Sequence, residues 1–242
     1  MKIAGYDTIE YPIPIAGRTF RLLGPRDPWS LFTEPGNVKR NRADGYSPYW
    51  STPWPGAVML AEYVIAHHPA DEEPILELGA GLGLAGLALS AFGHRVVITD
   101  YDRDALQFVQ ASADLNDIEL FEVRPVDWRK PPPAVFRMIL GADVLYEKDH
   151  QIGVLGLLRS CLHHRGAAIL ADQNRAIADD VIESARGFGF STEITPVKCR
   201  AIQRPDEIDG RILRGRIFTC RRSDYSGGSR GQPSEESRPP LH

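Results

Sequence analysis

The sequence has few cysteines and no long run of apolar residues. Its three cysteines, Cys161, Cys199 and Cys220, lie far apart without metal-ligand spacing, and their odd number argues against a disulfide framework. No metal is therefore expected. The amino terminus lacks a cationic segment followed by an apolar run, and no apolar segment approaches the roughly 18 residues of a membrane span. These absences predict a cytoplasmic protein that does not associate with a membrane.

The overall charge is also unremarkable. A net charge of -4 and a hydrophobic content of 43% over 242 residues are typical of one globular enzyme domain. One local excess stands out, because residues 198–222 contain eight basic and three acidic residues. This segment is either a solvated hairpin or a docking face for an acidic partner. The negative overall charge argues against a nucleic-acid partner, and the oligomeric state is not indicated.

The most informative segment that is present is glycine-rich. Residues 74–86 read Pro-Ile-Leu-Glu-Leu-Gly-Ala-Gly-Leu-Gly-Leu-Ala-Gly, which predicts a buried strand, a tight turn and a helix. Glycines allow the backbone to turn sharply and to approach a ligand closely. Asp100 follows the next apolar run, at the spacing where a carboxylate meets the ribose hydroxyls of a bound nucleotide. The alternative is a tight strand-helix turn without a ligand.

The position of Glu77 bears on which cofactor binds. Residues 81–86 also match the dinucleotide pattern G-x-G-x-x-G, which leaves a nicotinamide-dependent oxidoreductase as an alternative. A carboxylate two residues before the first glycine would repel a pyrophosphate but attract a cationic ligand. S-adenosylmethionine, with its amino group and sulfonium, is such a ligand. The chain also lacks a Tyr-x-x-x-Lys set and a second domain, which an oxidoreductase would be expected to have.

The hydrophobic pattern predicts an α/β fold with a doubly wound, mostly parallel sheet. Apolar runs of strand length alternate with helical patterns, and a helix is expected over residues 55–67 before the first of them. The expected parallel strands are residues 75–78, 96–99, 121–125, 136–140 and 167–171. Residues 189–197 and 212–220 are expected to form an antiparallel pair that closes one sheet edge.

Three divisions of the chain follow from this pattern. Residues 1–48 carry short strand-like runs broken by proline and glycine, and they are expected to form an amino-terminal hairpin or lid. Residues 49–222 would form the catalytic domain. Residues 223–242 are rich in serine, glycine, proline and charge, which predicts a disordered tail.

Polar and aromatic residues follow the expected strands where a ligand would bind. Asp127 and Trp128, after the third strand, could hold an adenine ring, or could be a helix cap and a core aromatic. The aromatic segment 49–56 could wall the cofactor, or could belong to the core. Asp143 and Tyr146 follow the fourth strand, where open α/β sheets bind substrates. Without further information they are equally a cap and a core aromatic.

Together these motifs resemble a known family. Glu77-Leu-Gly79-Ala-Gly81-Leu-Gly83 is similar to the first motif of the class I, seven-stranded methyltransferases. Asp-x-x-Tyr after the fourth strand and Asp-Trp after the third resemble the methyltransferase-like, seven-β-strand protein lysine methyltransferases. Residues 48–50 and 54–56 are most similar to the electron transfer flavoprotein β-subunit lysine methyltransferase branch. The resemblance covers residues 49–147 and does not extend to the amino-terminal region or to residues 199–210.

The resemblance implies a Rossmann-like fold, S-adenosylmethionine as cofactor and a role for each matching residue. Asp143 and Tyr146 match the signature associated with methyl transfer to lysine. The residues implied in cofactor binding are Trp54, Glu77, Gly79, Gly81, Asp100, Asp127 and Trp128. The implied partner is a protein that presents a lysine side chain. A small-molecule amine as acceptor and a non-catalytic cofactor-binding scaffold stay open, whereas the Asp/Asn-Pro-Pro-Tyr/Phe loop that adenine-modifying nucleic-acid methyltransferases share is absent after the fourth strand.

Overall fold

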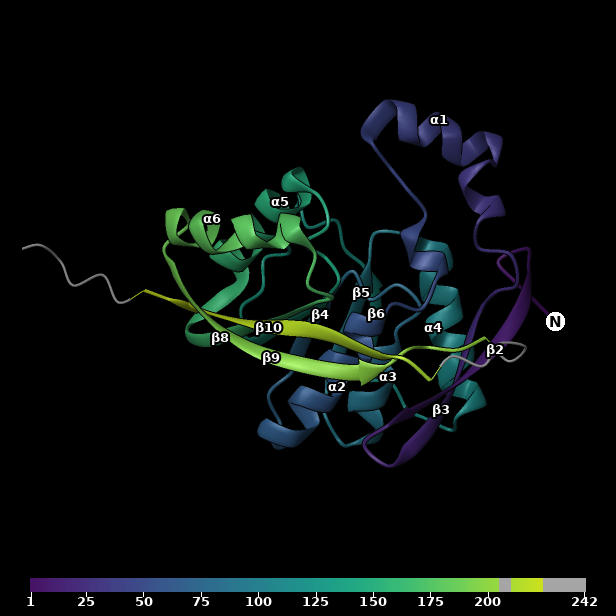
Figure 1. The fold of residues 1–242 in the computed structure, drawn as a ribbon, viewed down its shortest axis with the longest axis horizontal. Helices are drawn as coiled ribbons and strands as arrows, with labels where there is room; N and C mark the ends of the chain where they lie inside the picture. Colours follow the sequence, from purple (N-terminus) through teal and green to yellow (C-terminus); the bar gives the residue numbers. More distant parts are fainter. Residues whose placement is uncertain (205–209, 224–242) are drawn as a thin grey trace, which may run out of the picture.

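The computed structural model describes residues 1–204 and 210–223, and its centre is a seven-stranded sheet with helices on both faces (Figure 1). Of the tail predicted to be disordered, residues 224–242 lie outside the described part. The strands of the large sheet are β4 (Ile75–Leu78), β5 (Val96–Asp100), β6 (Glu122–Pro125), β7 (Phe136–Ala142), β8 (Leu162–Asp172), β9 (Phe190–Arg200) and β10 (Ile212–Arg222). Every predicted strand is present, within three residues of its expected bounds except β8, which begins five residues earlier than expected.

The strand order is β6-β5-β4-β7-β8-β10-β9. Strands β4 to β8 pair in parallel, whereas β10 runs antiparallel to both β8 and β9. The doubly wound sheet with an antiparallel pair at one edge is thereby confirmed. From β4 the chain first builds outward to β5 and β6 and then returns to the other side of β4 at β7. Such a reversal opens a crevice at the carboxyl ends of the central strands.

Each face of the sheet is covered by its own helices, and this explains the apolar character of the strands. All four residues of β4 and all five of β5 are buried, as expected for parallel strands that are covered on both faces. One hydrophobic cluster joins the sheet to α2 (Pro55–His67), α3 (Leu84–Ala91) and α4 (Arg103–Leu115). A second cluster joins the other face to α5 (Lys148–Cys161) and α6 (Val181–Gly187). Helix α2 has the bounds that the sequence predicts.

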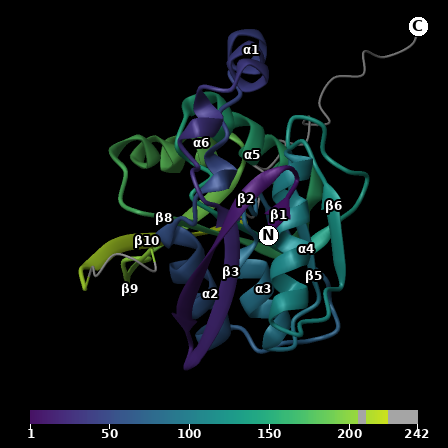
Figure 2. The same cartoon turned by 90° about the vertical axis from the view of Figure 1, so that its right-hand side faces the viewer.

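The amino-terminal residues form a separate antiparallel sheet. Its strands are β1 (Lys2–Ile3), β2 (Tyr6–Ile15) and β3 (Arg18–Pro25), and the predicted hairpin is the β2–β3 pair. Figure 2 shows β2 and β3 crossing in front of the helices of one face. The Leu23 N–H donates a hydrogen bond to the Ser112 hydroxyl of α4 (3.0 Å). The inward side chains of β2 and β3 belong to the same hydrophobic cluster as α2 to α4, so this sheet extends the core.

The chain between the two sheets lies over the carboxyl edge of the large one. It contains the 3-10 turns η1 (Ser30–Phe32) and η2 (Tyr49–Ser51) on either side of α1 (Pro35–Asp44). Helix α1 projects from the body in both views (Figures 1 and 2) and ends at Gly45, whose φ of 73° suits glycine. A further 3-10 turn, η3 (Ala176–Asp180), links β8 to α6.

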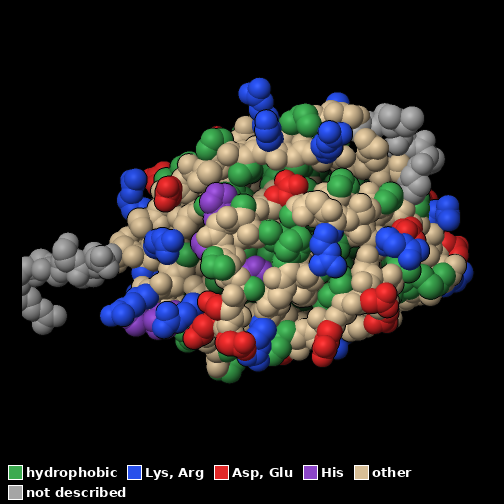
Figure 3. Space-filling model, turned by 90° about the horizontal axis from the view of Figure 1, so that it is seen from below, with side chains coloured by type: hydrophobic (Ala, Val, Ile, Leu, Met, Phe, Trp, Pro, Cys, Tyr) green, Lys and Arg blue, Asp and Glu red, His purple; other side chains and the backbone are tan. Residues whose placement is uncertain are grey.

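The surface carries charges of both signs, and the cysteines form no disulfide bonds among the described residues. Figure 3 shows one face, on which acidic and basic side chains are interspersed with hydrophobic ones. All three cysteines are free and buried. Within residues 1–204 and 210–223, no helix combines the length and apolar character that crossing a bilayer requires. The same residues contain no group of three or more His, Cys, Asp and Glu placed to hold a metal ion.

Candidate active site

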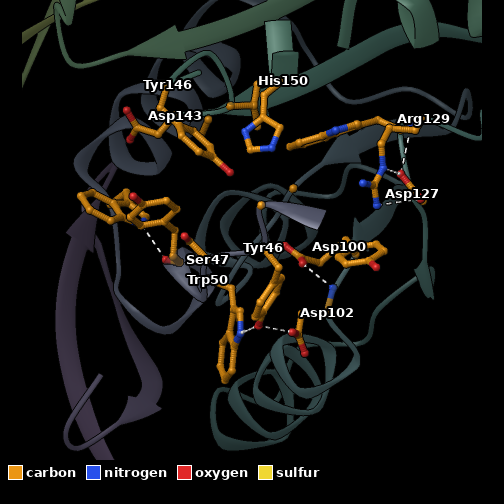
Figure 4. A pocket seen from close by; sticks show the side chains of 18 residues that line it. Tyr46, Ser47, Trp50, Asp100, Asp102, Asp127, Arg129, Asp143, Tyr146 and His150 are labelled. Atoms are coloured by element: carbon orange, nitrogen blue, oxygen red, sulfur yellow. Dashed lines mark hydrogen bonds and ion pairs between the residues drawn. The ribbon is translucent and has the colours of Figure 1, made fainter. Parts of the chain in front are cut away.

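A pocket lies at the carboxyl ends of β4 to β7, where the strand order reverses. The pocket is partly open to solvent, and aromatic rings and a few carboxylates line it, as is typical of small-molecule sites. Its wall includes seven of the nine residues that the sequence predicts for the site: Trp54, Gly79, Asp100, Asp127, Trp128, Asp143 and Tyr146. Figure 4 shows Asp143, Tyr146 and His150 on one side, facing Tyr46, Trp50 and Asp102 on the other.

The glycine turn forms the floor of this pocket. Gly79 has a φ of 57°, and a Cβ placed there would lie 3.0 Å from the Trp128 ring, so a larger residue would fill the space. The predicted Gly81 is not itself part of the wall. Its N–H donates a hydrogen bond to Asp100 Oδ2 (2.8 Å), which ties the turn to the end of β5. Gly81 therefore contributes to the pocket by fixing the orientation of the Asp100 side chain.

Glu77 lies beneath the turn rather than on the pocket wall. Its side chain is buried, and Oε1 accepts a hydrogen bond from the Gly86 N–H (3.3 Å). Oε2 has no hydrogen-bond partner within the described part of the chain. Burial raises the pKa of the Glu77 carboxyl to about 8, while the Gly86 N–H opposes the rise and Asp100 adds to it. An uncompensated buried carboxylate is costly, so this site favours a nearby cation.

This burial makes stability depend on pH through Glu77. Because the folded-state pKa of Glu77 lies above the ordinary value of 4.5, the folded protein keeps this carboxyl protonated over a pH range in which the unfolded chain ionises it. The free energy of unfolding therefore falls progressively as the pH rises from about 4.5 to 8. Glu77→Gln removes this loss. We expect the melting temperature of the variant minus that of the native protein to be larger at pH 9 than at pH 5 by at least about 4 °C.

Thermal melts at both pH values, without ligand, measure this difference. Glu193→Gln changes an exposed glutamate on β9 in the same way and is expected to behave like the native protein at both pH values. A melting-temperature difference for Glu77→Gln that is equal at pH 5 and pH 9 would contradict the assignment of the raised pKa to Glu77.

Asp100 ends β5 and faces the pocket. Besides the bond from Gly81, Oδ1 accepts a hydrogen bond from the Asp102 N–H (2.8 Å), so backbone groups hold the carboxylate in one orientation. Burial raises the pKa of Asp100 to about 6, although these backbone N–H groups oppose the rise. A fixed, partly desolvated carboxylate of this kind is a good acceptor for the hydroxyls of a ribose.

Asp127 and Trp128 lie together at the end of β6. Burial raises the pKa of Asp127, but hydrogen bonds from the Arg129 side chain and backbone outweigh it and hold the pKa below its ordinary range. The Arg129 guanidinium contacts both carboxylate oxygens, at 2.8 and 3.1 Å. The Trp128 ring makes an edge contact with His150, with centroids 5.5 Å apart. Because Arg129 engages both oxygens, an adenine amino group would have to share this carboxylate.

Asp143 is held between α2 and the loop after β8. Oδ2 accepts a hydrogen bond from the Gly56 N–H (2.8 Å), and Oδ1 accepts one from Arg175 Nη1 (2.7 Å). Burial raises the pKa of Asp143 in spite of the Arg175 guanidinium. Asp143 also has a φ of 55°, a strained value for a residue other than glycine, and such strain is concentrated at functional sites. The hydrogen bond from the Gly56 N–H to Asp143 therefore joins the motifs around these two residues into one arrangement.

Aromatic rings form the wall beside Asp143. Tyr146 makes edge contacts with Tyr49 (5.1 Å between centroids) and with His150 (4.7 Å). The Trp54 indole N–H donates a hydrogen bond to the Tyr49 carbonyl (2.8 Å), and Arg175 lies 5.7 Å from the Trp54 ring centre. Burial raises the pKa of Tyr146. This wall lowers the local polarity where an acceptor amine would enter.

Several wall residues were not singled out from the sequence. Tyr46 donates a hydrogen bond to Asp102 Oδ2 (2.5 Å) and accepts one from the Trp50 indole (3.1 Å). Arg40 of α1 pairs with Asp102 (3.2 Å), which also caps α4. These contacts hold residues 45–50 over the pocket. Four further residues were also not predicted, because each is a common residue type outside any motif and only the fold positions it. Arg129, His150 and Tyr101 line the pocket, whereas Arg175 contacts Asp143 without lining it.

The strand order and the covering helices give the fold of the class I methyltransferases, a class whose methyl donor is S-adenosylmethionine. A family model described as lysine methyltransferase matches residues 51–183, more than half of the chain. The chain belongs to this lysine methyltransferase family. The resemblance that the sequence motifs indicate is thereby confirmed.

Curated relatives agree with this assignment. The chain is 26% identical to methyltransferase-like protein 22 of Mus musculus over 61% of its own length and 42% of that protein. It is 26% identical to the electron transfer flavoprotein beta subunit lysine methyltransferase of Danio rerio over 55% and 53%. The histone-arginine methyltransferase METTL23 of Xenopus laevis is 33% identical over 40% and 46%. The chain thus spans about half the length of the curated relatives it matches.

Solved structures share the fold. The glycopeptide N-methyltransferase MtfA, solved with S-adenosylmethionine, matches 66% of this chain and 91% of its own with a TM-score of 0.52. At 13% sequence identity this likeness concerns the fold alone.

Proposed function

We propose that this protein transfers the methyl group of S-adenosylmethionine to the side chain of a lysine in another protein. The single observation that carries the proposal is the pocket in which a glycine turn, Asp100, Asp143 and Tyr146 meet in a member of the lysine methyltransferase family. Fold alone does not determine an acceptor. The acceptor is therefore proposed from the family and from the chemistry of the wall.

The residues around the turn fit the cofactor. When bound, S-adenosylmethionine supplies a sulfonium methyl that an amine can attack in line. A cationic ligand above the turn would stabilise the ionised form of Glu77, whose Oε2 has no hydrogen-bond partner among the described residues. Gly79 leaves space that a Cβ would fill, and Gly81 orients Asp100 toward the ribose. Trp54, Asp127 and Trp128 would complete the cofactor site around its methionine part and its adenine.

Asp143 and Tyr146 would handle the acceptor amine. A lysine has an ordinary pKa of about 10.4, so most of it is protonated at neutral pH and cannot attack. Burial beside the aromatic wall lowers that pKa, whereas a free carboxylate would raise it. Since Arg175 and the Gly56 N–H already engage Asp143, its charge is partly compensated and it can orient the amine without holding it fully protonated. Tyr146 would line the path of the methyl group, and the proton leaves through water or transiently through Asp143.

Two other acceptors are distinguished by experiment. A small-molecule amine would use the same cofactor site, and one matching relative is named a histone-arginine methyltransferase.

We place the reaction in the cytoplasm, because three buried free thiols suit a reducing compartment.

The test is incubation of the purified protein with radiolabelled S-adenosylmethionine and a lysate of its host, followed by separation of protein from small molecules. Label in a protein band that is recovered as methylated lysine after hydrolysis supports the proposal, and label only among small molecules replaces it with a metabolite methyltransferase. Cofactor binding without transfer to any acceptor would indicate a non-catalytic scaffold.

A further inference from the structure

A row of aromatic rings leads from the pocket to the protein surface. Tyr146 and Tyr49 belong to the pocket wall, with centroids 5.1 Å apart. Tyr49 contacts Phe32 at 5.4 Å, and Phe32 contacts Trp29 at 5.5 Å. Neither Phe32 nor Trp29 lines the pocket itself. The aromatic row therefore continues the pocket wall outward, over the segment that joins β3 to α1.

Trp29 forms the outer end of the row. Its relative solvent exposure is 61%, which is high for so large an apolar residue. Its backbone is nevertheless well held. The Ser30 N–H donates a hydrogen bond to Asp27 Oδ1 (3.2 Å), the Ser30 hydroxyl donates one to the Asp27 carbonyl (2.8 Å), and Leu31 is buried. A large apolar ring presented on an ordered turn loses little conformational freedom on binding. Exposed tryptophans of this kind are enriched among the residues that dominate protein interfaces.

We propose that Trp29 and Phe32 bind an apolar side chain of the acceptor protein, close to the lysine that enters the pocket. This inference rests on the proposed function and specifies its partner. The occupant follows from continuity, because the row begins at the tyrosines that flank the path of the lysine. The Tyr49 and Trp29 ring centres lie at most about 11 Å apart, which about three residues of extended chain span. The apolar residue is thus expected within a few positions of the methylated lysine.

A small-molecule amine would not extend to Trp29, so the surface also separates the two acceptor classes. Trp29→Ala removes the outer ring, and Trp29→Phe keeps an aromatic one. Phe121→Ala serves as the matched control: Phe121 is also an exposed aromatic, at 43%, but it directly precedes β6 and so lies at the sheet edge opposite the pocket. None of these positions belongs to the pocket wall.

The experiment measures the initial rate of labelling of the acceptor band with radiolabelled S-adenosylmethionine, as a function of lysate concentration. Binding of S-adenosylmethionine to each variant is measured separately by calorimetry. For Trp29→Ala we expect the lysate concentration that gives half-maximal rate to rise about tenfold, with the maximal rate and the cofactor affinity within about twofold of the native protein. Trp29→Phe should restore most of the loss, and Phe121→Ala should match the native protein.

Two results would overturn the inference while leaving the proposed function intact. In one, the native protein labels a protein band and Trp29→Ala follows the same concentration curve as Phe121→Ala. In the other, Trp29→Ala weakens cofactor binding as much as it weakens labelling, which would place the ring in the cofactor site. Label that the native protein transfers only to small molecules would instead reject the proposed function, and the docking surface with it.

Discussion

Asp143→Asn is expected to lower the rate of methyl transfer by about 100-fold or more, while the affinity for S-adenosylmethionine stays within about threefold. The substitution keeps the shape of the side chain but removes its negative charge and one of its two acceptor oxygens. Arg175 and the Gly56 N–H now compete for a single carbonyl oxygen. The amine then loses the group that orients it, whereas Asp100 and the glycine turn are unchanged.

The matched control is Asp179→Asn. Asp179 pairs with Arg216 in a neighbouring ion pair, but its side chain is 63% exposed and it does not line the pocket. Transfer by this variant should stay within about twofold of the native rate. Single-turnover assays with saturating cofactor, together with calorimetric binding of S-adenosylmethionine, measure both effects. An Asp143→Asn variant with intact turnover and normal cofactor affinity would exclude Asp143 from the transfer step.

Gly56→Ala is expected to give a loss of similar size without changing any functional group. A Cβ on Gly56 would lie 2.3 Å from Asp143 Oδ2 and 2.6 Å from its Cγ, so the carboxylate must move. Movement also weakens the hydrogen bond from the Gly56 N–H. A displacement of about 1 Å at a reacting group can cost about 100-fold in rate. The expected outcome is a 30- to 100-fold slower transfer, on the order set by that estimate.

The chain contains a closely matched control for this change. Helix α1 begins with Pro35-Gly36, as α2 begins with Pro55-Gly56, and a Cβ on Gly36 would meet nothing within 4 Å. Gly36→Ala should therefore leave transfer unchanged. Double substitution provides a second check: Gly56→Ala combined with Asp143→Asn should be little slower than Asp143→Asn alone, because both act on one group. Fully additive losses would indicate that Gly56 acts elsewhere.

The sequence predicts the parts of this site that local structure determines. The glycine turn at Gly79 and Gly81 and the carboxylate at Asp100 follow from short-range patterns, because a strand, a tight turn and a helix place them whatever surrounds them. For the same reason the strands and helix α2 are found close to their predicted bounds. Glu77 is predicted to bind the cofactor, and the fold places it beneath the turn instead of on the pocket wall.

Contacts between distant positions could not be predicted in the same way. The hydrogen bond between Gly56 and Asp143 joins residues 87 apart in the chain, and Arg175 reaches Asp143 across 32 residues. Each depends on how α2 and the loop after β8 pack against the end of β7. The aromatic row is a further example, since Trp29 and Phe32 carry no motif and are linked to the pocket wall by the contact of Phe32 with Tyr49.

The chemical identity of the methylated residue tests the central claim most directly. The native protein is incubated with lysate and radiolabelled S-adenosylmethionine, and the labelled proteins are hydrolysed to amino acids and separated by chromatography. Our account predicts that the label appears as methylated lysine and that Asp143→Asn largely removes it. Label recovered as methylarginine, or found only outside the protein fraction, would contradict a lysine methyltransferase whose acceptor amine is oriented by Asp143.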